Sequence, residues 1–132
     1  MKVFADTFYW IALTDFTDNA HARARQITDD IVTTDEVLTE YLTFFCGAPE
    51  FMRREVALAV EDILQGELVK VIPQSRESFL AGLNLYRDRP DKGYSLTDCI
   101  SMQTMRREGL LVVLTNDRHF EQEGFRALFR EI

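Results

Sequence analysis

Short apolar runs alternate along the chain with segments in which apolar residues recur every three or four positions. The short runs predict strands, and they lie at 3–5, 31–34, 68–72, 110–114 and, near the C-terminal end, 127–130. The periodic segments predict helices, and they lie at 8–13, 21–29, 35–45, 52–63, 79–86 and 95–107. Polar stretches rich in turn-forming residues predict loops at 15–19 and 87–94.

The alternation of strands and helices predicts an α/β fold, a three-layer α/β/α sandwich around a central, mostly parallel sheet. The 132 residues suit one domain, and no repeat or linker divides them, so we expect a single domain over 1–132. Ligands of such folds bind beyond the carboxyl ends of the strands. Candidate chemistry is therefore sought in the residues that follow each predicted strand.

Composition narrows the class of protein. Hydrophobic residues make up 46% and charged residues 28%, as in soluble globular proteins, and no apolar stretch is long enough to span a membrane. Asp6 interrupts the first apolar run, which argues against a signal peptide and favours a cytoplasmic protein. Cys46 and Cys99 lack zinc-type spacing and lie among hydrophobic residues, so we expect two buried thiols in a reducing compartment.

The net charge is −7, from 22 acidic and 15 basic residues. Over the whole surface this balance argues against a nucleic-acid partner, because phosphate binding is usually accompanied by a basic surplus. Function, however, depends on local sites. The placement of the acidic residues therefore matters more than their number.

Three acidic residues are predicted near one edge of the sheet. Asp6 directly follows the first strand, and Asp117 follows the strand 110–114 after a short connection. The carboxyl ends of parallel strands share an edge, so these two side chains are expected there together. Asp98 lies in the first turn of a helix that begins after Ser95. It either caps that helix or extends its carboxylate into the same crevice.

A fourth acidic residue lies on the helix 35–45. On a helical wheel Glu40 is roughly 115° and Glu36 roughly 155° from the centre of the apolar face. Glu36 is therefore expected in solvent, whereas Glu40 lies at the boundary, as a surface residue or within reach of the sheet edge.

Clustered carboxylates repel one another and require protons or a cation, and oxygen ligands suit Mg²⁺ or Mn²⁺. Such an ion activates water for in-line attack on a phosphodiester.

The ordered set of motifs resembles the PIN domain, and in particular the small prokaryotic proteins of VapC type. The resemblance covers about residues 2 to 130. It rests on Asp6-Thr7, Thr33-Thr34, Val37-Leu38-Thr39-Glu40, Ser95-Leu96-Thr97-Asp98-Cys99, Leu114-Thr115-Asn116-Asp117-Arg118-His119-Phe120 and Glu123-Gly124-Phe125. Members of this family are mostly Mg²⁺- or Mn²⁺-dependent ribonucleases with the α/β/α fold.

The resemblance also implies roles for individual residues and partners. Its acidic metal site falls on Asp6, Glu40, Asp98 and Asp117, and the small hydroxyl residues beside it match Thr7 and Thr115. Asp6, Asp98 and Asp117 are expected to bind the metal directly, and Glu40 to bind a second ion or to orient water. The implied partners are an RNA substrate, a second copy of the chain in a homodimer, and a small antitoxin whose tail covers the acidic groove.

Two other functions remain open. One is a PIN-fold scaffold that binds protein without catalysis. The other is a receiver-like domain in which an aspartate is phosphorylated beside Mg²⁺. That mechanism normally needs a lysine at a strand end, and Lys2, Lys70 and Lys92 do not lie at such positions.

Several neighbouring residues have an ordinary structural interpretation beside a functional one. Asp91 is expected to cap its loop rather than assist catalysis, and His119 to hold its loop rather than contact phosphate. The aromatic residues of the first helix are expected in core or dimer packing rather than in base stacking, and they are Phe8, Tyr9 and Trp10. Four basic residues near the acidic ones are phosphate contacts or simply solvated, and they are Arg87, Arg89, Lys92 and Arg118.

Overall fold

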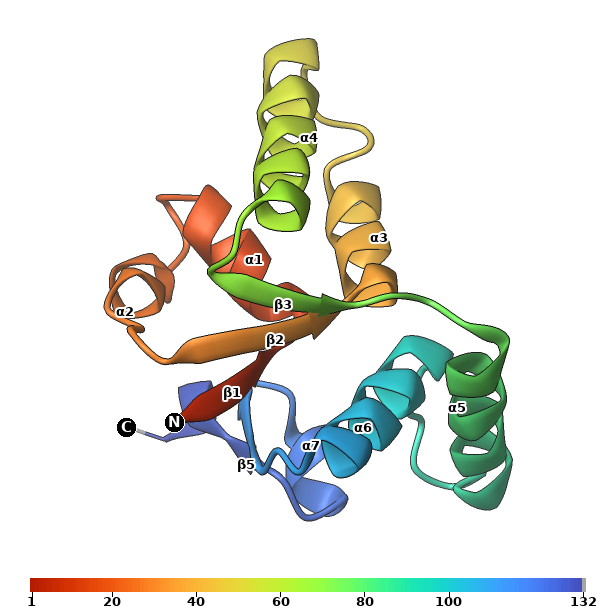
Figure 1. Cartoon of the computed structure of the whole chain (residues 1–132). Helices are drawn as coiled ribbons and strands as arrows, with labels where there is room; N and C mark the ends of the chain where they lie inside the picture. Colours follow the sequence, from red (N-terminus) through yellow and green to blue (C-terminus); the bar gives the residue numbers. More distant parts are fainter. Residues whose placement is uncertain (132) are drawn as a thin grey trace.

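Five short strands form one sheet at the centre of the computed structural model, which describes residues 1–131 (Figure 1). The strands are β1 (Lys2–Ala5), β2 (Asp30–Thr34), β3 (Val69–Ile72), β4 (Val112–Leu114) and β5 (Arg126–Ala127). Their order across the sheet is β3-β2-β1-β4-β5, and every neighbouring pair is parallel. The α/β fold is confirmed, and the sheet is parallel throughout.

Helices flank this sheet (Figure 1). They are α1 (Thr7–Thr14), α2 (His21–Arg25), α3 (Asp35–Phe44), α4 (Glu50–Gln65), α5 (Arg76–Asp88), α6 (Leu96–Glu108), α7 (Arg118–Gln122) and the 3-10 helix η1 (Leu128–Arg130). Polar side chains fix where two of them begin. Thr34 accepts a hydrogen bond from the backbone N–H of Val37 at the start of α3, and Ser95 accepts one from Asp98 at the start of α6. None of the helices among residues 1–131 combines the length and apolar character needed to cross a membrane.

The order of the strands creates a switch point between β1 and β4. The chain builds outward from β1 through β2 to β3 and then returns to add β4 and β5 on the other side. Ala5 pairs with Leu114 where these two central strands end. The residues that follow, Asp6 and Thr115, are consequently placed side by side at the edge where such sheets bind ligands.

The core lies around β1 and β4, which are buried on both faces as expected for central parallel strands. Helix α6 contributes Met102 and Met105, which are fully buried. Helices α5 and α6 lie side by side in Figure 1, and Gly82 permits their close approach. A Cβ atom at Gly82 would lie 2.4 Å from Cγ1 of Ile100, so a larger residue there would push the helices apart.

Several local predictions differ from the structure. The last strand is β5 at Arg126–Ala127, and the residues after it form η1 instead of continuing the strand to 130. The sequence analysis did not predict α7, which has only five residues, too few for a periodic pattern. Cys99 is buried as expected, but the prediction for Cys46 is wrong, since it is exposed beyond the end of α3.

Candidate metal centre

Asp6 occupies the centre of the ligand-binding edge. It directly follows β1, precedes the first residue of α1, and is only 7% exposed. The hydroxyl of Thr115, which directly follows β4, donates a hydrogen bond of 2.8 Å to Oδ2 of Asp6. This contact joins two positions that are 109 residues apart, and it follows from the parallel pairing of β1 with β4. The expected proximity of the first acid to the end of β4 is therefore observed.

Asp117 is positioned by the loop between β4 and α7. Its backbone N–H donates to the hydroxyl oxygen of Thr115 at 3.2 Å, so Thr115 contacts both acidic residues. The carboxylate of Asp117 accepts a hydrogen bond of 2.9 Å from the backbone N–H of His119 and thereby caps α7. The carboxylate is about one-third exposed, which leaves it accessible to a ligand.

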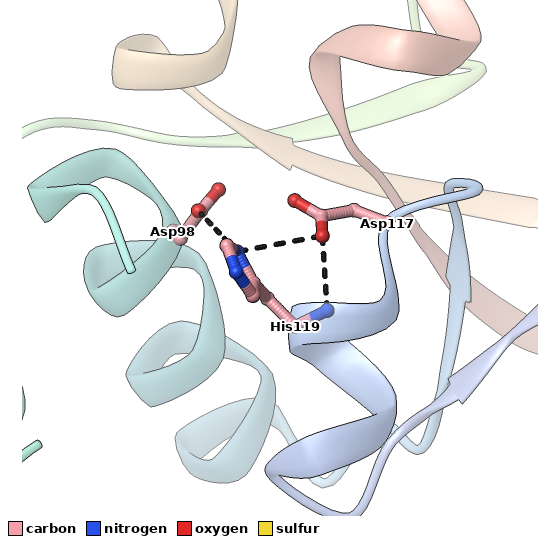
Figure 2. Close-up of side chains that lie close together, drawn as sticks. All are labelled: Asp98, Asp117 and His119. Atoms are coloured by element: carbon pink, nitrogen blue, oxygen red, sulfur yellow. Dashed lines mark hydrogen bonds and ion pairs between the residues drawn. The ribbon is translucent and has the colours of Figure 1, made fainter. Parts of the chain in front are cut away.

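Asp98 serves as a helix cap and also belongs to the acidic edge. Ser95 and Asp98 form a capping box, in which Oδ2 of Asp98 accepts the backbone N–H of Ser95 at 3.3 Å. In Figure 2 the carboxylates of Asp98 and Asp117 point toward the space between α6 and the start of α7. The two interpretations of Asp98 from the sequence are therefore compatible.

His119 lies between these two carboxylates (Figure 2). Its Nδ1 atom is 3.4 Å from Oδ1 of Asp117 and 3.8 Å from Oδ2 of Asp98. This nitrogen is buried and has no hydrogen-bond partner among the described residues. The side chain of His119 was expected to hold its loop. The contact that caps α7 is instead made by the backbone N–H of His119, and Nδ1 takes no part in it. The sequence placed His119 near Asp117 but gave no sign that its ring faces Asp98.

Glu40 joins the site from α3. The hydroxyl of Thr7 donates a hydrogen bond of 2.5 Å to Oε1 of Glu40 and so fixes this side chain against the start of α1. Glu40 is half-buried, in agreement with its boundary position on the helical wheel. Glu36 is also half-buried, contrary to the solvated position expected for it, because it lines a separate cavity beside Arg76 and Phe79.

Burial and the neighbouring carboxylates raise the pKa of Asp6 and of Asp98. Burial raises the pKa of Asp6 to about 7, with further increases from the negative charges of Asp98 and Glu40 that outweigh the hydrogen bond from Thr115. Burial also raises the pKa of Asp98, and the charges of Asp117 and Glu40 act in the same direction. Within residues 1–131, no lysine or arginine forms an ion pair with any of these four side chains.

Two of these carboxylates, Asp98 and Asp117, form a donor set with His119 that fits a divalent cation, and Asp6 and Glu40 lie outside this set. Asp98, Asp117 and His119 each offer one ligand atom, and these atoms lie within 4.8 Å of one another. Carboxylate oxygens are the ligands that Mg²⁺ and Mn²⁺ prefer, and an imidazole nitrogen is compatible with Mn²⁺. The buried nitrogen without a partner and the uncompensated negative charge both indicate a place for a cation.

A second cluster contacts the site through the ring of Tyr94. We call it the Glu123 cluster, and it consists of Arg89, Tyr94, Arg106 and Glu123. The carboxylate of Glu123 accepts hydrogen bonds from Arg89 at 3.1 and 3.2 Å, from Arg106 at 2.9 Å and from the hydroxyl of Tyr94 at 2.8 Å. The ring of Tyr94 in turn contacts that of His119 edge-on, with centroids 5.2 Å apart. The cluster thereby ties the end of α7 to α6 and to the loop before it.

The Glu123 cluster revises the expected roles of the basic residues. Arg89 was a candidate phosphate contact, but its guanidinium is bound to Glu123. Lys92 lies 3.9 Å from Asp91, and both are exposed in the loop between α5 and α6. Arg87 pairs with its exposed neighbour Asp88.

The aromatic residues of α1 divide between two environments. Tyr9 and Trp10 are buried in the core, which confirms core packing for both. Phe8 is half-buried and packs edge-on against Phe129, at a centroid distance of 5.2 Å. Phe8 is therefore partly accessible to solvent, whereas Tyr9 and Trp10 are buried.

Comparisons with known proteins agree with this architecture. A crystal structure of the Mycobacterium tuberculosis protein VapC20, described as a Sarcin-Ricin loop cleaving toxin, superposes with a TM-score of 0.82 at 23% identity, covering 93% of this chain and 95% of that one. At this identity the likeness shows the shared fold. No curated protein matched by sequence. The family model of the PIN domain matches residues 3–125. The chain therefore belongs to the PIN domain family.

Proposed function

We propose that this chain is a Mg²⁺- or Mn²⁺-dependent endoribonuclease. The observation that carries the proposal is the set of four carboxylates at the switch point of a PIN fold, which have no lysine or arginine partner among the described residues. Asp6, Asp98 and Asp117 are the proposed metal ligands, with His119 beside them. Carboxyl groups with a raised pKa, such as those of Asp6 and Asp98, are typical of binding and catalytic sites.

The residues of the chain have distinct tasks in this proposal. A bound divalent ion supplies charge neutralisation at the scissile phosphate and lowers the pKa of water for in-line displacement. Thr115 orients Asp6 and the backbone of Asp117 at once, so it keeps two ligands in a fixed relation. Glu40, held by Thr7, is placed to orient the attacking water or to bind a second ion.

We further propose that the chain is the toxin of a toxin–antitoxin pair that acts as a homodimer. The similarity to VapC20 supports RNA as the substrate class. The uncompensated carboxylates support a basic protein segment as the inhibitor, because a lysine or arginine would neutralise them as a metal does. An adjacent reading frame for a small protein with a basic tail would add support.

The decisive experiment is metal-dependent cleavage of a total RNA pool with mapping of the cut sites. We expect cleavage by the purified chain in Mg²⁺ or Mn²⁺, loss of cleavage with chelator, and loss in Asp98→Asn with the fold intact. Asp91→Asn is the matched control, since Asp91 is an exposed aspartate seven residues earlier in the chain that pairs with Lys92.

Three outcomes would contradict the proposal. Full activity in Asp98→Asn would reject the assigned site. Absence of cleavage with either metal, together with tight binding of a protein partner, would favour the scaffold alternative. Labelling of the chain by a small phosphodonor would instead favour the receiver-like alternative.

A further inference from the structure

A cavity of about 610 Å³ opens between α1, α2 and the C-terminal segment, and its lining includes Asn116, the residue before Asp117. Its volume is in the range of sites that hold small molecules or parts of larger ligands. Its walls combine aromatic rings with polar side chains, among them Phe8, Asp18, Asn19, Arg23, Asn116 and Phe129. The site described above uses none of these side chains.

Three connections fix this cavity relative to the metal centre. Phe8 directly follows Thr7, which holds Glu40. Asn116 lies between Thr115 and Asp117, so its Cα is about 3.8 Å from that of a proposed metal ligand.

The third connection is a backbone hydrogen bond of 3.1 Å from Phe129 N–H to the carbonyl oxygen of Thr115. The cavity and the proposed metal centre therefore draw residues from the same two stretches of backbone, 7–8 and 115–117.

The aromatic wall is held rigidly. Phe8 and Phe129 contact each other edge-on at an interplanar angle of 64°. The guanidinium of Arg23 lies 5.0 Å from the centre of the Phe129 ring and donates hydrogen bonds of 2.7 Å to the carbonyl oxygens of Leu128 and Glu131. These contacts hold the guanidinium of Arg23 against the ring of Phe129. A fixed aromatic surface favours stacking of a flat ligand.

The polar wall offers uncommitted amides. The side chains of Asn19 and Asn116 are exposed and make no hydrogen bonds to other described residues. An asparagine amide has a donor and an acceptor side by side, which is the pattern that reads the edge of a nucleobase. The formal charges of Asp18 and Arg23 oppose each other in this wall, in contrast to the strongly negative metal centre. An uncharged planar group therefore suits the cavity better than a phosphate.

We propose that this cavity binds a nucleobase of the RNA strand, next to the phosphate that is cleaved, and gives the enzyme its base preference. Phe8 and Phe129 form the stacking surface, and Asn116 reads the edge of the base. The inference rests on the proposed function for the position of the phosphate.

The test measures binding separately from cleavage. Four 3′-labelled tetraribonucleotides, A₄, C₄, G₄ and U₄, are titrated with the Asp98→Asn protein in Mg²⁺ by fluorescence anisotropy, and a gel confirms that each strand stays intact. In this background we expect the tightest tetranucleotide to bind about tenfold more strongly than the weakest, as one well-formed amide–base pair provides. Loss of measurable binding for all four, or equal affinities, overturns the proposal.

Two further variants in the same background locate the preference. Asn116→Ala is expected to reduce the spread to about threefold or less, with the weakest affinity unchanged, because only edge recognition is lost. Phe8→Leu is expected to weaken all four by about tenfold without changing their order, because stacking tolerates every base. Asn84→Ala on the exposed face of α5 is the matched control and leaves all affinities unchanged. Thermal melting verifies that each variant is folded.

The outcomes separate this inference from the proposed function. In one outcome the wild-type chain cleaves RNA, but Asn116→Ala does not change the spread of affinities among the four tetranucleotides. That result overturns the nucleobase site and retains the ribonuclease. In another outcome the affinities differ among the four tetranucleotides and the difference depends on Asn116, but the wild-type chain cleaves no RNA. That result retains the nucleobase site and rejects the ribonuclease. If Asn116→Ala and Phe8→Leu weaken the binding of a protein partner and leave RNA binding unchanged, the cavity is the binding site of that partner. The proposal is then overturned.

Discussion

Two groups of largely buried carboxylates lie close together in this molecule and have opposite surroundings. Glu123 is 5% exposed and contacts two arginines and a tyrosine hydroxyl. Asp6 is 7% exposed, and its closest charged neighbours are other carboxylates. Burial acts to raise the pKa of Glu123, but the hydrogen bonds from Arg106, Arg89 and Tyr94 outweigh it and lower that pKa. The pKa of Asp6 is raised.

The contrast distinguishes a structural carboxylate from a functional one. The negative charge of Glu123 is neutralised inside the fold, so its contribution is stability. The charges of Asp6 and Asp98 are left without a counterion among the described residues, and a group held in that state is a candidate for ligand binding. Removal of each type should therefore have opposite effects on stability and activity.

The largest expected effect is on catalysis. Asp6→Asn should lower the proposed metal-dependent cleavage by about a thousandfold, roughly 4 kcal/mol of transition-state stabilisation, because it removes a proposed metal ligand. The same change should not destabilise the metal-free protein at pH 8, since it relieves repulsion and the amide oxygen still accepts from Thr115. Cleavage rates and urea unfolding measure the two effects. A clear loss of stability would contradict the comparison.

Glu123→Gln should have the largest effect on stability. We expect the free energy of unfolding to fall by about 2 kcal/mol, because a buried carboxylate bound to two arginines is removed while those half-exposed arginines regain water. Glu121→Gln is the control on the same helix, where an exposed pair with Arg130 is lost and the change should stay within about 0.5 kcal/mol. If the two substitutions lowered the free energy of unfolding equally, the proposed structural role of Glu123 would be contradicted.

The two groups should also give opposite pH dependence. The pKa of Asp6 in the folded state is raised to about 7, so its contribution is present below its ordinary value of 3.8 and is lost as the pH rises through 7. Glu123 has a lowered pKa, so its contribution is present above its ordinary value of 4.5 and is lost as the pH falls through the folded value.

Unfolding of the metal-free protein by urea across pH 3 to 9 tests this expectation. Asp6→Asn should remove the decrease between pH 4 and 8, and saturating Mg²⁺ should oppose it, since a bound cation favours the ionised carboxylate. Glu123→Gln should flatten only the acid side of the curve. A wild-type curve that rises steadily from pH 4 to 8 without metal would contradict the assignment for Asp6.

The smallest effect concerns the hydroxyl that holds Asp6. Thr115→Val should raise the pKa of Asp6 further and weaken Mg²⁺ binding at pH 7 by several-fold, about 1 kcal/mol, because the lost hydrogen bond favours the ionised form. Calorimetric titration measures the affinity. Thr104→Val is the matched control, since the hydroxyl of Thr104 is buried without a hydrogen-bond partner in residues 1–131 and its removal should leave binding unchanged.

The sequence predicted those features that follow from local pattern and parallel topology. The apolar runs located the strands within a few residues, and the rule for carboxyl ends placed Asp6 and Asp117 at one edge. The helical wheel correctly placed Glu40 at the boundary of α3. The metal-binding roles of these residues remain predictions.

What the sequence did not predict depends on contacts between distant segments. Glu123 meets Arg89 across 34 positions and Arg106 across 17, and no local spacing marks such partners. The orientation of His119 depends on how α6 and α7 pack, and Cys46 is exposed just beyond the end of α3. Short elements such as α7 and η1 contain too few residues for a periodic signal.

The positions of Asp6 before α1 and of Asp98 in the first turn of α6 also bear on how the protein would take up the proposed metal ion. The N-terminal end of a helix carries a partial positive charge of about half an elementary charge from its aligned peptide dipoles. Two such ends face the acidic edge and partly offset its charge before any ion arrives. The cation is thus expected to be a ligand of a finished fold, so that a chelator silences the protein without unfolding it.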